Sequence, residues 1–304
     1  MCRLVRFGLL AAAAVTSFGA SVVTKIPGGD TVPVYRLKLD PFLAPPTRLV
    51  GVVVRARING GPPLRLLLDS GANLITLDPR AAAKSNCAAG IDLDLVGAGA
   101  SAAAGVKQVR AATVEIGPVS LRELPVLISG RVVAEGIEGV LPLSVFSGFL
   151  IRLNVPRKTL DLLPYPAAST EGSDNLRVLS NNNLLFVRGT VTGRREGYFL
   201  LDTGASYVAV SKTVARELNL SEALAERVPL QAGTTELDAP LVRSGVRLRF
   251  GARELEAGSV VTVDLSVSSR YHNLDIAGLL GFPALSGSVL VVNYRDGLVR
   301  IDSR

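Results

Sequence analysis

The sequence is poor in several residue types that build functional sites. Tryptophan is absent, histidine occurs once among 304 residues, and aromatic residues make up 5% of the chain. A single histidine, His272, excludes zinc sites built from several histidines and leaves one candidate base for a serine or cysteine triad. The segment around it, SSRYHNLDIAG (268–278), offers no recognisable nucleophile partner. We therefore expect His272 to lie in a loop without a catalytic role.

Cysteine is also scarce, with Cys2 and Cys87 as the only two. Cys2 lies in an N-terminal segment that we expect to be removed, and it is too near the start of the chain to be a lipid-attachment cysteine. The mature chain would then have one thiol and no internal disulfide, so its stability has to come from its apolar core. Cys87 follows an alanine-rich stretch and is expected to pack rather than to act as a nucleophile.

Basic residues are in excess but scattered. The formal net charge is +7, and no run of five or more Lys or Arg occurs. Basic residues are not interleaved with aromatic ones, as they are in many nucleic-acid interfaces. The sequence therefore indicates a solvated basic surface and argues against nucleic acid as a partner. The stretch GAGASAAAG (97–105) lacks the Lys-Ser/Thr ending of a phosphate-binding loop, so it is expected to be a flap or a plain loop.

Residues 1–20 have the layout of a secretory signal peptide. Two arginines precede an apolar run, and small residues follow it. The run is short for a membrane span, and charge or proline interrupts every other apolar run. We expect cleavage near Gly19 or Ala20 and a periplasmic or secreted protein whose mature chain has no membrane span. Retention of residues 1–20 as an uncleaved N-terminal anchor is the alternative.

The remaining composition favours strands. Hydrophobic residues make up 48% of the chain, mostly Val, Leu, Ala and Ile, in runs broken by the 30 glycines and 17 prolines. Such runs are typical of β-rich proteins, and the length suffices for one large or two modest domains. We expect an all-β fold with a few short helices.

The chain contains an internal repeat centred on two acidic residues. Asp69 and Asp202 lie 133 positions apart, and at that shift residues 52–78 align without gaps with residues 185–211. Further on, residues 137–155 (IEGVLPLSVFSGFLIRLNV) align with residues 276–294 (IAGLLGFPALSGSVLVVNY) at a shift of 139. Because the two blocks keep their order, a domain of about 120 residues is duplicated.

Each repeat is expected to form a strand, a turn, a strand, an acidic loop, a strand and a short helix. One helix is expected over 78–86, with Asp78 as its cap and Pro79 at its first position, and one over 211–220, with Ser211 as its cap. The expected strands are 50–58, 64–68, 74–77, 107–116, 121–128, 242–250 and 259–264, and a turn is expected over NGGPP (59–63).

These patterns divide the chain into five parts. The division is a signal peptide (1–20), an N-terminal extension (21–47), a first lobe (48–163), a linker (164–180) and a second lobe (181–304). The linker contains most of the polar, proline-containing stretch LPYPAASTEGSDN. The extension has no clear role and could cover a cleft or add a strand.

Both repeated acids end an apolar strand, where a buried charge is costly. If the repeats pack about a pseudo-twofold axis, Asp69 and Asp202 meet, and two neighbouring carboxyl groups share one proton. One carboxylate could then activate a water molecule while the other group protonates a carbonyl oxygen. The sequence therefore predicts hydrolysis of an amide without a metal, an organic cofactor or a covalent intermediate.

The residues after each acid fit such a pair. Gly71 and Gly204 lack a Cβ, so the two backbones can approach each other closely. Ser70 and Thr203 offer hydroxyl groups that can bridge to the opposite loop and hold the pair. We expect these four residues to brace the two aspartates.

Each repeat thus carries a D-[ST]-G triplet, at 69–71 and 202–204, and this motif resembles that of the aspartic protease superfamily. The alanine after each triplet, Ala72 and Ala205, is more similar to the retropepsin-like branch than to pepsin. The resemblance covers most of residues 48–304. It implies a bilobal, pseudo-twofold fold of two retropepsin-like β-barrel lobes with a substrate cleft between them.

The resemblance also implies an activity. Asp69 and Asp202 would be the catalytic pair of an aspartic endopeptidase that cleaves a peptide or protein substrate, and which aspartate is acid or base stays open. A monomer is expected because one chain contains both halves. The alternative is a catalytically inactive peptide-binding or scaffolding module with the same fold.

Two further elements of the family have candidates here. The family carries two apolar residues and a glycine late in each lobe, in a loop beneath the acid. Residues 276–278 (IAG) fit this element well, whereas residues 137–139 (IEG) fit less well because Glu138 interrupts it and GVLP replaces the more usual second glycine. The family also closes a hairpin flap over its cleft, for which 96–106 and 232–241 are the candidates.

The alanine after each triplet predicts a pH range. Its side chain cannot donate a hydrogen bond to the carboxylates, as Ser or Thr could, so the pKa values of the pair should be higher. We therefore expect activity at mildly acidic to neutral pH rather than below about pH 3. The acids that lack the strand-acid-glycine context are expected to be surface or turn acids, namely Asp40, Asp92, Asp94 and Asp275.

Overall fold

The computed structural model describes most of the chain after residue 34. The described ranges are 35–44, 47–87, 90–96, 102–130, 134–165, 175–220, 226–232, 235–243 and 245–303. The expected signal peptide lies outside these ranges. Within them, no helix has the length and apolar character that a membrane span requires.

The N-terminal repeat forms an eight-stranded sheet. Its order is β2-β3-β4-β9-β5-β8-β7-β6, and a further pairing of β3 with β7 closes the sheet on itself. The strands are β2 (Asp40–Ala44), β3 (Arg48–Ile58), β4 (Leu64–Asp69), β5 (Ile75–Leu77), β6 (Ile91–Val96), β7 (Ala102–Ile116), β8 (Val119–Ile128) and β9 (Gly139–Pro142).

The C-terminal repeat and the strands that join the lobes form a second sheet of 15 strands. Its main path is β1-β11-β10-β22-β23-β12-β13-β14-β21-β15-β20-β17-β16, with β18 attached to β13 and β19 attached to β18. The strands before the second repeat are β1 (Tyr35–Lys38), β10 (Leu150–Asn154) and β11 (Thr159–Leu163). The others are β12 (Leu176–Asn181), β13 (Leu184–Val191), β14 (Arg195–Asp202), β15 (Val208–Ser211), β16 (Glu226–Ala232), β17 (Thr235–Val242), β18 (Val246–Phe250), β19 (Arg253–Ala257), β20 (Val260–Val263), β21 (Ile276–Gly281), β22 (Ser288–Asn293) and β23 (Leu298–Ser303).

The described helices are short. They are α1 (Pro79–Lys84), the 3-10 helix η1 (Leu143–Phe146), α2 (Lys212–Glu217), α3 (Ser266–His272) and α4 (Phe282–Leu285). The Asp78 carboxylate accepts a hydrogen bond from the backbone N–H of Ala81 at 2.7 Å, and the Ser211 hydroxyl accepts one from that of Val214 at 3.1 Å. Both expected caps are therefore confirmed.

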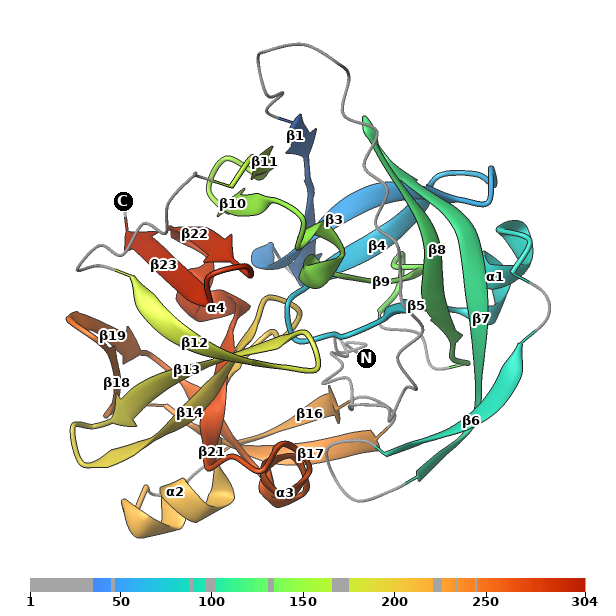
Figure 1. The fold of residues 1–304 in the computed structure, drawn as a ribbon. Helices are drawn as coiled ribbons and strands as arrows, with labels where there is room; N and C mark the ends of the chain where they lie inside the picture. The colour runs from blue at the N-terminus through green and yellow to red at the C-terminus, as the bar shows by residue number, and fades with distance from the viewer. Residues whose placement is uncertain are drawn as a thin grey trace.

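The two repeats have the same strand pairing. In each, the strand that ends in the acid runs parallel to a later strand, as β4 does to β9 and β14 to β21. The registers are equivalent: Leu66–Gly139 and Asp69–Pro142 in the first repeat, Phe199–Gly278 and Asp202–Gly281 in the second. These pairs reproduce the two sequence shifts, so the expected bilobal, all-β, pseudo-twofold fold is confirmed. Figure 1 shows the N-terminal lobe in blue to green and the C-terminal lobe in yellow to red.

A glycine in each repeat permits this pairing. A Cβ built on Gly139 would lie 2.2 Å from the carbonyl oxygen of Thr76, and one built on Gly278 would lie 2.2 Å from that of Ala209. No side chain fits at either distance, so these glycines allow the middle strand of each lobe to pass close to its antiparallel neighbour.

Strands from both halves join the lobes into one body. β10 pairs with β22, and β1 adds a strand beyond β11. The guanidinium of Arg36 on β1 donates two hydrogen bonds to the carboxylate of Asp161, at 2.6 and 3.0 Å. β2 pairs with β3. The described part of the extension therefore adds strands to both sheets.

One apolar core runs through both lobes. Leu66 and Leu68 of β4 and Phe199 and Leu201 of β14 belong to the same cluster, and each has 0% of its surface exposed. Burying a side chain of this size contributes roughly 1.5–3 kcal/mol to folding. The residues between them, Leu67 and Leu200, are buried in two other apolar clusters, so both faces of each acid-bearing strand are packed.

Three local expectations differ from the structure. The strand expected over 242–250 is interrupted, because β17 ends at Val242 and β18 begins at Val246. The last residues of the expected linker form β12, which pairs with β13 and β23. His272 is the last residue of α3 rather than a loop residue, and its ring packs against that of Phe186 with centroids 4.9 Å apart.

Glu138 does not interrupt the first repeat. Its carboxylate accepts a hydrogen bond from the backbone N–H of Arg65 at 3.0 Å and pairs with Lys84 at 3.0 Å, while its backbone bonds to Arg65 and Asp78. The side chain thus turns outward and secures the start of β4, whereas Ala277 at the equivalent position of the second repeat is buried.

Candidate active site

The two repeated acids lie at equivalent points of the two lobes. Asp69 is the last residue of β4 and Asp202 the last residue of β14, and each has 1% of its surface exposed. Each follows an apolar strand that the core holds on both faces. Folding therefore carries both carboxyl groups to buried positions where an unpaired charge would be costly.

Ser70 and Thr203 connect the two acid loops directly. The backbone N–H of Ser70 donates to the Thr203 hydroxyl at 3.0 Å, and the backbone N–H of Thr203 donates to the Ser70 hydroxyl at 3.0 Å. Each hydroxyl in turn donates to a carbonyl oxygen of the opposite lobe, Ser70 to Leu201 at 2.7 Å and Thr203 to Leu68 at 2.9 Å. Four buried hydrogen bonds thus fix one loop against the other.

The glycines of the triplets let each carboxyl group lie on the opposite loop. A Cβ built on Gly71 would lie 2.4 Å from the Cγ of Asp202, and one built on Gly204 would lie 2.3 Å from the Cγ of Asp69. Any side chain there would displace the carboxyl group. Gly71 and Gly204 therefore allow Asp69 and Asp202 to lie next to each other, as the repeat predicted.

The two carboxylates differ in their backbone donors. Asp69 accepts from the backbone N–H of Gly71 at 2.7 Å. Asp202 accepts from two such groups, those of Gly204 at 3.0 Å and Ala205 at 2.8 Å. Because hydrogen bonds from N–H groups favour the ionised form, this asymmetry favours ionisation of Asp202 over Asp69.

Burial raises the pKa of both acids, and the charge of Asp202 raises the pKa of Asp69 further. Burial and the charge of Asp202 raise the pKa of Asp69 well above its usual range, against the backbone N–H of Gly71 and, more weakly, that of Gly204, whose hydrogen bond goes to Asp202. Burial raises the pKa of Asp202 to about 6, against hydrogen bonds from Asp69, Ala205 and Gly204. The pair therefore keeps one proton between its two carboxyl groups across the pH range between their titrations.

Such a pair can act as a base and an acid at the same time. The ionised carboxylate can take a proton from water, and the protonated group can donate one to an oxygen atom. The rigid strands and the cross-lobe bonds keep both groups in place for that chemistry. In the described part of the chain, no group of three or more His, Cys, Asp or Glu side chains is arranged to hold a metal ion.

Both flap candidates fall in β-hairpins. β6 pairs with β7 through Val96 and Ala102, and β16 pairs with β17 through Ala232 and Thr235. The residues that join each pair of strands lie outside the described ranges.

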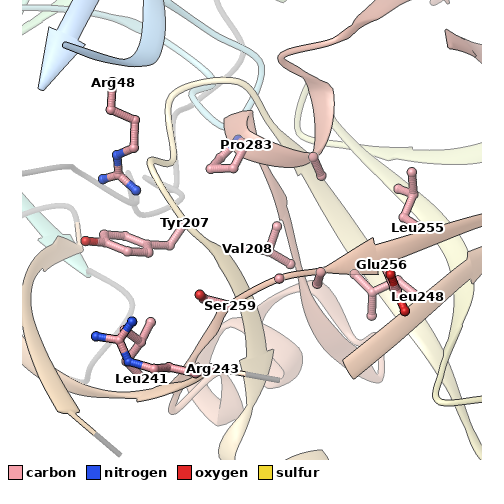
Figure 2. A pocket seen from close by; sticks show the side chains of 13 residues that line it. Arg48, Tyr207, Val208, Leu241, Arg243, Leu248, Leu255, Glu256, Ser259 and Pro283 are labelled. Carbon is pink, nitrogen blue, oxygen red and sulfur yellow. The ribbon is translucent and has the colours of Figure 1, made fainter. Parts of the chain in front are cut away.

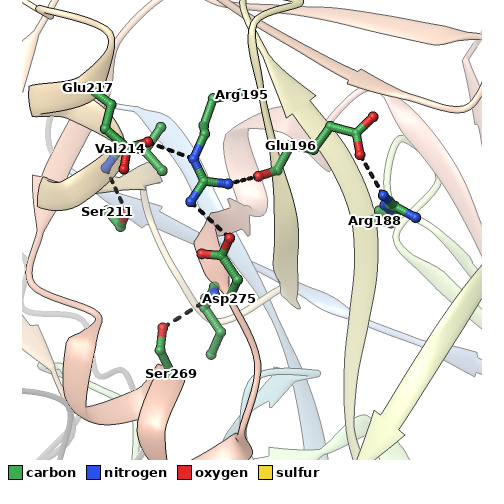
Figure 3. Close-up of polar contacts among 9 residues, drawn as sticks. Arg188, Arg195, Glu196, Ser211, Val214, Glu217, Ser269 and Asp275 are labelled. Carbon is green, nitrogen blue, oxygen red and sulfur yellow. Dashed lines mark hydrogen bonds and ion pairs between the residues drawn. The ribbon is translucent and has the colours of Figure 1, made fainter.

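An arginine at the start of β14 joins three elements of the C-terminal lobe (Figure 3). Arg195 lies at the start of β14, and its guanidinium contacts Glu217 at the end of α2 at 2.6 Å and Asp275 before β21 at 2.8 Å. The carbonyl oxygen of Asp275 accepts a hydrogen bond from the backbone N–H of Tyr198 at 2.8 Å. Arg195 thus ties together the strand that carries Asp202, its parallel neighbour and a helix.

The other acids behave as expected where the structure describes them. Asp40 pairs with Arg55 at 2.9 Å and keeps 39% of its side chain exposed, and Asp275 keeps 60% exposed. The side chains of Asp92 and Asp94 lie outside the described part. Cys87 is buried, with 4% of its surface exposed, which fits packing rather than reaction.

Three residues near the site were missed by sequence reasoning. Tyr294 follows β22, its buried hydroxyl has no hydrogen-bond partner among the described residues, and burial, Tyr165 and Asp69 raise its pKa. Its counterpart in the first repeat is Val155, so the repeat gave no signal for a polar group there. The others are Arg48 and Tyr207, whose contact joins the lobes and has no local sequence pattern.

Comparison with known proteins adds a family and a fold. A family model described as aspartyl protease matches residues 54–145 and again residues 187–284. The structure is similar to the crystal structure of the aspartic proteinase from Irpex lacteus, with a TM-score of 0.53 and 11% sequence identity over 89% of this chain and 97% of that one. No curated protein matches the chain.

Proposed function

Because the chain belongs to the aspartyl protease family, we propose that it is an aspartic endopeptidase that cleaves peptide bonds with a water molecule activated by Asp69 and Asp202. The observation that carries the proposal is the cross-lobe geometry. Each carboxyl group lies against the glycine of the opposite triplet, and the Ser70 and Thr203 bonds hold the loops together. Both acids, both hydroxyls and both glycines are intact, which argues against a decayed site.

The difference in the number of backbone N–H donors suggests which aspartate is the base and which is the acid. Asp202 has two backbone donors and is the ionised partner in our proposal, whereas Asp69 holds the shared proton. Asp202 then takes a proton from water as the water oxygen attacks the peptide carbonyl carbon, and Asp69 gives its proton to the carbonyl oxygen. The result is a neutral tetrahedral diol, with the two roles exchanged.

Collapse of the diol completes the reaction. Asp202, now protonated, gives its proton to the amide nitrogen, the carbon–nitrogen bond breaks, and Asp69 takes a proton from a diol hydroxyl as the new carboxyl group forms. The pair returns to its starting state with Asp69 protonated. The cycle consumes one water molecule and needs no metal, cofactor or covalent intermediate.

The experiment is cleavage of a peptide library by the purified mature chain, beside Asp69→Asn and Asp202→Asn. We expect cleavage by the wild type and loss of at least about 1,000-fold in each variant, since each removes one half of the acid–base pair. Far-UV circular dichroism checks that the variants remain folded. A folded wild type that cleaves nothing would favour the inactive peptide-binding module, and cleavage that survives both substitutions would place the chemistry elsewhere.

We also propose that the protein is exported and works as a monomer in the periplasm or outside the cell. The basis is the arrangement of residues 1–20 and the presence of both halves of the site in one chain. Fractionation of cells and the N-terminal sequence of the recovered protein test export. A protein that stays in the membrane with residues 1–20 attached would favour the uncleaved anchor.

A further inference from the structure

A pocket of about 530 Å³ opens where the two lobes meet beside the second acid loop. Its lining comes mainly from the C-terminal lobe and includes Val208, Leu241 and Pro283, whereas Arg48 is contributed by the N-terminal lobe. Figure 2 shows Arg48, Tyr207 and Arg243 at one end and Glu256 at the other, with apolar side chains between them. The pocket is therefore apolar in its middle and basic at the end that both lobes build.

Arg48 is the positive charge that this pocket offers to a ligand. Its guanidinium carbon lies 5.1 Å from the centre of the Tyr207 ring, so one face of the group stacks on the aromatic ring. Stacking leaves the N–H groups on the edge of the guanidinium free to donate in its plane. No carboxylate among the described residues pairs with Arg48, whereas Arg243 forms an ion pair with Glu226.

Several pocket residues are close in the chain, or in strand pairing, to the residues of the aspartate pair. Tyr207 follows Asp202 by five residues, which limits their separation to about 17 Å. Pro283 follows Phe282, whose backbone N–H donates to the carbonyl oxygen of Ala205 at 2.8 Å. Arg48 begins β3, which pairs with the strand that ends in Asp69. A peptide held at the two acids in an extended form would reach the pocket within about five residues of the cleaved bond.

We propose that this pocket selects substrates with an acidic side chain. Arg48 binds the carboxylate of that side chain, while the apolar lining of the pocket covers its methylene groups. The proposal rests on the proposed function and specifies its substrate class. A planar guanidinium matches the two oxygens of a carboxylate, and its stacking on Tyr207 holds it at the basic end of the pocket. Glu256 at the opposite end disfavours a carboxylate there, which leaves the Arg48 end as the place for the acid.

The test compares glutamate with glutamine in otherwise identical peptides. A peptide cleaved by the wild type is resynthesised with Glu or Gln in turn at each of about five positions on either side of the cleaved bond. The measured quantity is the ratio of kcat/KM for the Glu peptide to that for the Gln peptide. We expect a ratio of about three to ten at one position for the wild type, because a partly exposed charge pair has this modest strength.

Variants of the pocket residues test whether the charge of Arg48 causes the preference for the Glu peptide. Arg48→Gln should reduce the ratio to near one, and Arg48→Lys should give an intermediate ratio because it keeps the charge but not the planar donors. Glu256→Gln is the matched control in the same pocket and should keep the preference. A ratio near one at every position in the wild type, or an unchanged ratio in Arg48→Gln, overturns the proposal.

A binding measurement separates this proposal from the proposed function. Random peptides displayed on phage are selected on the wild type and on Arg48→Gln at a pH where the protein is folded. Enrichment of Asp or Glu on the wild type that is lost in the variant supports the pocket even if no peptide is cleaved. Absence of such enrichment, with no cleavage preference, overturns the proposal whether or not the protein is a protease.

Discussion

The hydroxyls of Ser70 and Thr203 each accept a hydrogen bond from the other's backbone N–H group at 3.0 Å, across the boundary between two lobes. Each hydroxyl also donates to the opposite strand. The residues are 133 positions apart in the sequence and fully enclosed in the fold. The relationship makes the geometry of the aspartate pair depend on how the lobes pack.

Thr203→Val should therefore weaken both stability and catalysis. The substitution removes the hydrogen bonds of the Thr203 hydroxyl with the backbone N–H of Ser70 and the carbonyl oxygen of Leu68, which should lower the free energy of unfolding by about 2–4 kcal/mol. Loosening the acid loops should lower kcat/KM about tenfold or more. Urea unfolding and peptide cleavage measure the two effects. Thr203→Ser keeps the hydroxyl and should stay near the wild type, and an equal loss in both variants would contradict this account.

Gly71→Ala should abolish activity by steric displacement. The new Cβ would lie 2.4 Å from the Cγ of Asp202, so that carboxyl group has to move, and kcat/KM should fall about 100-fold or more. Gly148→Ala is the control, since a Cβ there meets nothing within 4 Å. Steady-state cleavage of one peptide by both variants suffices. Near-normal kcat/KM in Gly71→Ala would mean that Asp202 does not lie against this glycine during catalysis.

The raised pKa values predict how stability depends on pH. The pKa of Asp202 is about 6 in the folded protein and 3.8 in a model peptide, so the folded state binds more protons between these values. Its contribution to stability is complete below about pH 3.8 and is lost as the pH rises through about 6. Buried carboxyl groups should thus make the wild type less stable near pH 7 than a variant without the charge.

Asp202→Asn should remove that loss. We expect the variant to be more stable than the wild type at pH 7, on the order of 2 kcal/mol in the free energy of unfolding, with the difference vanishing near pH 4. Urea unfolding at several pH values measures it. A difference that stays constant with pH would show that Asp202 titrates alike in the folded and unfolded states.

Arg195→Gln should cost stability without altering the acid pair. Its guanidinium keeps 26% exposure and contacts both Glu217 and Asp275, so the free energy of unfolding should fall by about 1 kcal/mol, and by less in 1 M salt. Arg188→Gln is the matched control on the same strand pair, because Arg188 and Glu196 are 71% and 61% exposed and should contribute little. Equal effects of the two substitutions would contradict the bracing role of Arg195.

Much of the fold and the aspartate pair could be predicted because each repeat encodes them locally. An apolar strand that ends in an acid, followed by a hydroxyl and a glycine, is a contiguous pattern, and its repetition at a fixed shift indicates that Asp69 and Asp202 are equivalent. The helix caps Asp78 and Ser211 are also local, because each side chain accepts a hydrogen bond from the backbone N–H three residues later. Patterns of this kind can be recognised in the sequence because the residues that interact are close together in the chain.

Features that depend on packing between distant segments could not be predicted in this way. Arg48 meets Tyr207 across the lobe boundary, and neither stands in a pattern that the repeat duplicates. Glu138 breaks an apolar motif in the sequence, and only its bonds to Arg65 and Lys84 explain why it fits. His272 lies in a polar stretch that resembles a loop in the sequence. In the structure it ends α3 and its ring is buried against Phe186.

The pH dependence of kcat/KM for one cleaved peptide, between pH 3 and 8, tests the central claim that Asp69 and Asp202 share a proton to hydrolyse peptide bonds. We predict that activity rises with pH near about 6, as Asp202 becomes ionised, and persists at neutral pH while Asp69 keeps its proton. An optimum below about pH 4 with activity lost by pH 6 would contradict the claim, because two carboxyl groups buried as these are should not both be ionised there.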